Sequence, residues 1–86
     1  MWFMECPNDD EGLLRPLVTS SGRLVVMCDG GGEVWLSPGE LTEDAALYPQ
    51  HPDWVVAPGV DVTPGTTRWA DIEDLPPDWR SVEMQG

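Results

Sequence analysis

The chain has 86 residues, of which 41% are hydrophobic, and its 16 acidic residues against four Arg and no Lys give a formal net charge of −12. This length predicts one small domain over residues 1–86. The charge disfavours binding to nucleic acid and to anionic membranes, and it favours a basic protein partner. The N-terminal residues lack the basic and apolar regions of a signal peptide, so we expect a cytoplasmic protein, and the Lys-free, Gly- and Pro-rich composition suggests a bacterial source.

The first 36 residues predict short antiparallel strands. Two apolar runs, 13–19 and 23–27, flank a Ser-Ser-Gly turn, which is the pattern of a β-hairpin. Pro16 lacks an N–H, so we expect the first of these strands to lie at a sheet edge or to contain a break. Two further short strands are expected at 2–5 and 33–36.

The clearest helix signal begins at Ser37. Ser37 and Glu40 are spaced as the N-cap and third residue of a capping box, and Leu36 and Leu41 are spaced as a hydrophobic staple. These signals predict a helix over about 38–47 that ends before the next proline.

The rest of the chain is Pro-rich and predicts little regular structure beyond two short extended pieces around an Ala-Pro-Gly turn. Trp69, Ile72 and Leu75 follow one another at three-residue spacing, which predicts a second short helix over about 67–75. We expect the tryptophans of this half to pack on the strands as core. The predicted fold is α+β: a small antiparallel sheet of three to five strands over residues 4–36, then a capped helix and a Pro- and Trp-rich segment over 37–86.

Two motifs raise the question of a metal site. Residues 6–9 read CPND and residues 28–32 read CDGGG, which is the spacing of two zinc knuckles, except that Asp9 and Gly31 stand where the second cysteines would be. With the hairpin between them and an aromatic residue after them, residues 4–36 resemble small bacterial zinc-ribbon proteins. The resemblance implies an antiparallel ribbon that holds a tetrahedral zinc between its knuckles. Gly31 has no side chain, so this ligand set offers at most three donors.

Three interpretations of Cys6 and Cys28 therefore stay open. The pair binds zinc together with Asp9, or forms a disulfide, or consists of buried thiols in a ribbon that binds no metal. We predict the last of these, and hence no metal ligand and no cofactor. His51 is an alternative fourth zinc ligand, although a solvated loop imidazole is the simpler interpretation. Without zinc, the Trp-rich half must supply the folding free energy that the metal would give.

We assign no catalytic residues. The acidic residues of 8–12 lack the flanking helices and spacing of a calcium-binding EF-hand, and the glycines of 29–33 lack the Lys of a phosphate-binding loop. A single His leaves no visible catalytic triad. The sequence predicts a non-enzymatic acidic protein-binding domain, such as an inhibitor or immunity-type protein against a basic partner. The alternative is a zinc-stabilised ribbon that acts as an accessory or regulatory module, followed by a small metal-dependent enzyme.

Overall fold

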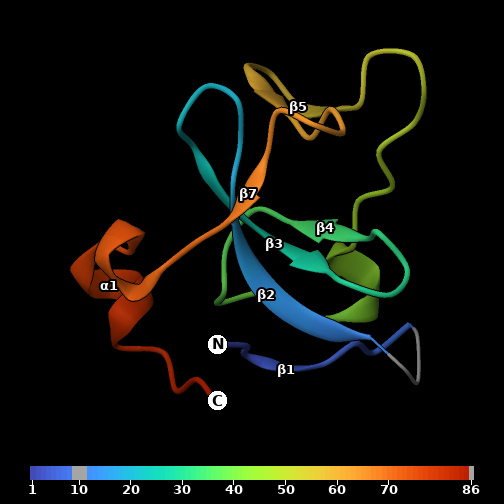
Figure 1. Cartoon of the computed structure of the whole chain (residues 1–86). Helices are drawn as coiled ribbons and strands as arrows, with labels where there is room; N and C mark the ends of the chain where they lie inside the picture. Colours follow the sequence, from blue (N-terminus) through green and yellow to red (C-terminus); the bar gives the residue numbers. More distant parts are fainter. Residues whose placement is uncertain (9–11, 86) are drawn as a thin grey trace.

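The hairpin of β2 (Leu13–Val18) and β3 (Leu24–Cys28) forms the centre of the sheet, as its two apolar runs predict. In this computed structural model, which describes residues 1–8 and 12–85, the two strands pair antiparallel over five residue pairs, from Leu14 opposite Cys28 to Val18 opposite Leu24 (Figure 1). The Thr19 N–H donates to the Arg23 carbonyl at 2.8 Å and closes the turn.

Short strands extend this hairpin on both sides. On one side β4 (Val34–Trp35) pairs with β3, and on the other side β1 (Met4–Glu5) and β7 (Arg68–Trp69) pair with opposite ends of β2. A separate two-stranded sheet is formed by β5 (Val55–Ala57) and β6 (Val60–Asp61). The strands expected near residues 2–5 and 33–36 are therefore present, although each is only two residues long, and the two expected extended pieces form β5 and β6.

Pro16 lies in the middle of β2, which is neither at an edge nor broken, contrary to our expectation. The Pro16 carbonyl accepts from the Ala70 N–H at 2.9 Å. The N–H and C=O of a strand residue point to the same side of the strand. The missing N–H of Pro16 therefore faces the gap between β1 and β7, which pair with β2 on that side. The proline is tolerated because it falls between two successive partner strands.

Alternating residues of the central strands enter two different cores. One core contains Leu14, Val26 and Trp35, and the other contains Leu17 and Val25. Successive strand residues point to opposite faces, so these sets cover the two faces of the sheet. The N-terminal segment and the chain around Leu75 and Trp79 cover the first face, while β6 and the residue after it cover the second. A sheet buried on both faces explains why its strands read as continuous apolar runs rather than alternating ones.

The prediction of a helix over 38–47 is wrong. Only a single 3-10 turn, η1 (Glu43–Ala45), forms there. The backbone of Leu47 instead exchanges two hydrogen bonds with Val34, at 2.7 and 2.8 Å, and the Thr42 carbonyl accepts from the Trp35 indole N–H at 2.8 Å. Sheet pairing and the hydrogen bond of a buried indole thus use backbone groups that a helix would need. Leu36, which the sequence predicted to form a hydrophobic staple, is 48% exposed.

The prediction of a helix over 67–75 is also wrong. Its first part forms β7, which pairs with the free edge of β2, and its second part forms the 3-10 turn η2 (Ile72–Asp74). The described chain forms an α-helix only after this segment, in the four-residue α1 (Pro77–Arg80). A nine-residue helix is marginal by itself because its nucleation is costly, and pairing with β2 wins over it. The fold is a small antiparallel sheet with short turns of helix rather than an α+β fold with two helices.

The tryptophans divide between core and surface. Trp35 and Trp79 are buried, and Trp79 meets Phe3 edge to face with ring centroids 6.1 Å apart. Trp54 packs partly buried against the second core. Trp69 is 37% exposed, and the Arg15 guanidinium lies 4.4 Å from the centre of its ring. The expectation that the second half contributes core is confirmed for Trp54 and Trp79 and wrong for Trp69. Across the described residues, no helix has the length and hydrophobicity needed to cross a membrane.

Leu14→Ala and Leu36→Ala form a matched pair that tests this core against the predicted helix. Leu14 is fully buried, so its truncation should lower the free energy of unfolding by about 2–5 kcal/mol. Leu36 is half exposed, and its truncation should cost less than about 1 kcal/mol. Urea unfolding measures both. Equal losses would contradict the structure and support a staple beneath a helix.

The ion pair between Arg68 and Asp74 predicts a dependence of stability on pH. Both guanidinium nitrogens donate to the carboxylate, at 2.8 and 2.9 Å, and these bonds, followed by the one from the Asp71 N–H, hold the pKa of Asp74 below its usual 3.8. A lowered pKa in the folded state gives stability that is present above about pH 4 and is lost as the pH falls below it. Thermal melts of Asp74→Asn and wild type should therefore differ at pH 7 and converge at low pH. A difference that stays constant with pH would contradict this origin.

Candidate metal centre

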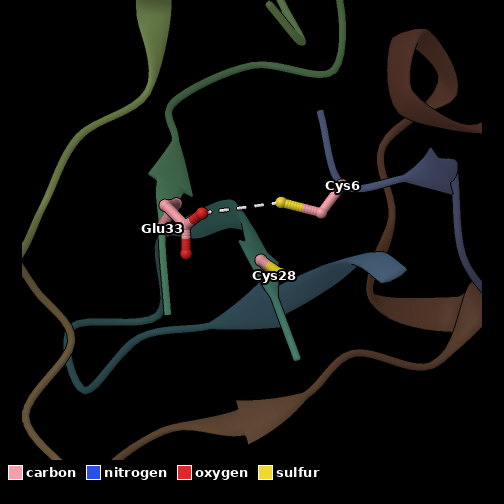
Figure 2. A group of neighbouring side chains, drawn as sticks. All are labelled: Cys6, Cys28 and Glu33. Atoms are coloured by element: carbon pink, nitrogen blue, oxygen red, sulfur yellow. Dashed lines mark hydrogen bonds between the residues drawn. The ribbon is translucent and has the colours of Figure 1, made fainter. Parts of the chain in front are cut away.

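A buried cluster of Cys6, Cys28 and Glu33 is the candidate site. The two sulfurs and one carboxylate oxygen all lie within 4.8 Å of one another (Figure 2). The Cys6 thiol donates to Glu33 Oε2 at 3.6 Å. The three residues are 6%, 2% and 6% exposed, in that order. The cluster joins the segment after β1, the end of β3 and the residue before β4.

Two facing loops position the sulfurs. In the first loop the Cys6 N–H donates to the Gly12 carbonyl at 2.9 Å. In the second loop the Cys28 N–H donates to the Glu33 carbonyl at 2.9 Å, and the Gly31 N–H donates to the Cys28 sulfur at 3.3 Å. Gly32 has φ +81, in the left-handed region that glycine adopts at low cost, and it allows the tight return from Cys28 to Glu33.

Two glycines leave the space that the cluster fills. A Cβ added to Gly31 would overlap Glu33 Oε1, so the carboxylate occupies the place of a side chain at position 31. A Cβ added to Gly12 would overlap the Cys28 sulfur. The residue that removes a ligand from the zinc-ribbon pattern therefore makes room for a different donor, Glu33.

Burial sets the protonation of Cys6 in the protein alone. Loss of solvation is the largest effect, a backbone hydrogen bond at Asn8 opposes it, and the adjacent Cys28 and Glu33 add to it; together these effects raise the pKa of the Cys6 thiol to about 12. A neutral thiol is a poor nucleophile, so the cluster is unsuited to thiolate catalysis without a cation that displaces the proton.

The structure brings together only part of the predicted ligand set. Cys6 and Cys28 meet as free thiols, not as a disulfide. Asp9 lies outside the described residues. His51 is exposed, packs edge to face against Trp54 and does not belong to the cluster. Gly31 contributes only its backbone N–H.

Glu33 is the residue that sequence reasoning missed. It lies five residues after Cys28 and immediately before β4, and knuckle spacing assigns it no role. The one available signal is the glycine run before it, because three successive glycines leave space for a neighbouring side chain to turn inward.

The donor set suits a soft to borderline divalent cation. Two thiolates and one carboxylate are ordinary zinc ligands, and the buried carboxylate forms no ion pair with a basic side chain among the residues that the structure describes. When bound, zinc would be held by Cys6, Cys28 and Glu33 and would act as a cross-link between the two loops. Structural zinc sites usually have four protein ligands, so three donors leave one coordination position for a water molecule.

Comparisons with protein-family models, with curated proteins and with solved structures found no match. The resemblance of residues 4–36 to zinc-ribbon proteins consequently stays a prediction.

Gly12→Ala tests the packing of the cluster. The added methyl group would overlap the Cys28 sulfur, with the Gly30 nitrogen and Cys6 Cβ also close, so we expect a loss of about 1–3 kcal/mol in the free energy of unfolding. The control is Gly39→Ala, whose Cβ meets only the Ser37 hydroxyl at 3.6 Å and should change stability by less than about 0.5 kcal/mol. Denaturant unfolding of both variants under reducing conditions measures the difference. An unchanged Gly12→Ala protein would contradict this close approach.

Proposed function

We propose that this chain is a non-enzymatic protein-binding domain whose partner is basic. The supporting charge is large: the chain carries 16 acidic residues and four Arg. Two of these arginines are already engaged with carboxylates, Arg68 with Asp74 at 2.8 Å and Arg15 with Asp29 at 3.8 Å. Most acidic side chains are therefore left to interact with solvent or with a partner. Such a surface accelerates association with a cationic protein and makes it sensitive to salt.

One observation carries the proposal beyond net charge. A pocket of about 270 Å³ opens between β4 and the η1 turn, and its lining residues comprise four apolar side chains and two carboxylates. These residues are Trp35, Leu36, Glu40, Asp44, Ala45 and Leu47. Neither Glu40 nor Asp44 forms an ion pair with another residue that the structure describes.

The chemistry of this pocket matches a lysine or arginine side chain. The aliphatic part of such a side chain packs on apolar surface, and here Leu36 is 48% exposed beside the partly buried Leu47. Its charged end then reaches the carboxylates of Glu40 and Asp44. A basic side chain of the partner thus satisfies both the apolar and the charged parts of the pocket.

The specific form of the proposal is an inhibitor or immunity-type protein that covers a cationic effector. Small size and high negative charge suit that role, because complementary charge speeds association with a strongly basic surface and disfavours other partners.

A second candidate function is a zinc-stabilised module that acts as an accessory or regulatory subunit. The observation that favours it is the buried Cys6–Cys28–Glu33 cluster. Zinc would stabilise the module, and the two candidates are compatible because the acidic pocket and the cluster use different residues.

Charge removal at the pocket tests the proposed function. The protein is immobilised, partners are captured from a lysate of its source at low salt, and the affinity of the captured protein is then measured by titration. The double variant Glu40→Gln/Asp44→Asn should weaken binding by about tenfold, as expected for two partly exposed ion pairs. Binding should also weaken as salt rises, since salt screens exposed charges.

The control removes the same two charges elsewhere. Glu5→Gln/Glu73→Gln changes exposed residues that do not line the pocket. This control should retain nearly all of the affinity. An equal loss in both double variants would show that only net charge matters, and failure to capture any basic protein at low salt would count against the proposed function itself.

A further inference from the structure

We propose that Cys6, Cys28 and Glu33 bind one zinc ion, with Glu33 supplying the donor that Gly31 cannot. This inference rests on the second candidate function and gives it a ligand set. It replaces the set that the sequence suggested, in which Asp9 was the oxygen donor. It is independent of whether a basic partner binds the acidic pocket.

The distances fit a tetrahedral ion. A sulfur at about 2.3 Å and an oxygen at about 2.1 Å from zinc lie roughly 3.6 Å apart when the angle at the metal is tetrahedral. Cys6 Sγ and Glu33 Oε2 are 3.6 Å apart, and the Cys28 sulfur lies within 4.8 Å of both residues' ligand atoms. Sub-ångström movements would bring all three donors onto one ion.

The charge of the cluster also calls for a cation. Glu33 is 6% exposed and has no ion pair with a basic side chain in the described chain. A buried carboxylate is costly unless an opposite charge or several hydrogen bonds compensate it. Its side-chain hydrogen bond in the described structure comes from a thiol, which is a weak donor. A divalent cation between the sulfurs and this carboxylate removes the cost.

The backbone around both sulfurs suits metal ligands. The Gly31 N–H donates to the Cys28 sulfur, and a backbone hydrogen bond at Asn8 reaches Cys6. Such groups around the ligands orient them and stabilise their charged form. On binding, two S–H bonds break, two S–Zn bonds and one O–Zn bond form, and two protons leave to solvent. A water molecule completes the four-coordinate ion, whose oxidation state does not change.

Cobalt titration of the untagged, reduced protein tests the ligand set. Co²⁺ replaces Zn²⁺ in tetrahedral sites and reports thiolate ligands through a sulfur-to-metal charge-transfer band, while its visible bands report four-coordination. We expect one Co²⁺ per chain, displaced by Zn²⁺, with a charge-transfer intensity corresponding to two thiolates. Cys28→Ser should halve that intensity.

Glu33 is tested by three variants. Glu33→Gln should keep the two-thiolate intensity but weaken cobalt binding at least tenfold, whereas the control Glu40→Gln should bind as wild type does. Gly31→Ala leaves every ligand in place but pushes its new methyl group into the Glu33 carboxylate, so it should weaken binding as well. In Gly31→Cys/Glu33→Ala the thiol takes the space of the carboxylate, and the charge-transfer intensity should rise to that of three thiolates.

The outcomes separate this inference from the proposed function. The metal site is overturned if the reduced wild-type protein does not bind cobalt stoichiometrically. It is also overturned if protein purified without reductant has an intact mass two hydrogens lighter, as for a Cys6–Cys28 disulfide, and added metal does not prevent this change. Wild-type affinity in both Glu33→Gln and Gly31→Ala overturns the role of Glu33. The pocket variant Glu40→Gln/Asp44→Asn should leave the cobalt spectrum unchanged, so loss of partner capture and loss of metal binding are distinguishable.

Discussion

The pairing of β2 with β3 is the constraint on which the rest of the structure depends. Its register sends Leu14, Val26 and Cys28 to one face and Leu17 and Val25 to the other. Each face is covered by chain from a distant part of the sequence, because a sheet with two apolar faces needs two covers. In so small a domain this arrangement uses one hairpin to organise two cores.

Local signals predicted the strands well and the helices badly, and the two results share one cause. The central hairpin is local, with a short turn that the sequence displays directly. Whether residues 38–47 form a helix depends on long-range competition: Leu47 pairs with Val34, and the Thr42 carbonyl binds the Trp35 indole. A capping box describes only the local preference, and tertiary pairing overrides it here. The same competition converts residues 68–69 into a strand.

The sequence predicted two of the three residues of the candidate site, because local spacing identifies the cysteines but not the residue that packs against them from another part of the loop. Knuckle spacing brought Cys6 and Cys28 together, because the hairpin between them fixes the distance between the two loops. Glu33 enters through a steric vacancy at Gly31, which no spacing rule describes. Leu75 and Trp79 pack in the same core that contains both cysteines, so apolar packing from the second half of the chain surrounds the cluster. The second half of the chain stabilises this face of the sheet with or without an ion.

The brevity of β1 has a kinetic consequence. The residues around this two-residue strand are held by a few backbone bonds: Phe3 N–H to the Leu14 carbonyl at 2.7 Å, Cys6 N–H to the Gly12 carbonyl at 2.9 Å, and a pair between Trp2 and Gln85 at 2.8 and 3.1 Å. Peeling away the N-terminal segment is therefore a local opening that leaves the β2–β3 hairpin intact. It uncovers Phe3 and Cys6 together. Local opening of this segment therefore offers a solute a route to the Cys6 sulfur that does not require global unfolding.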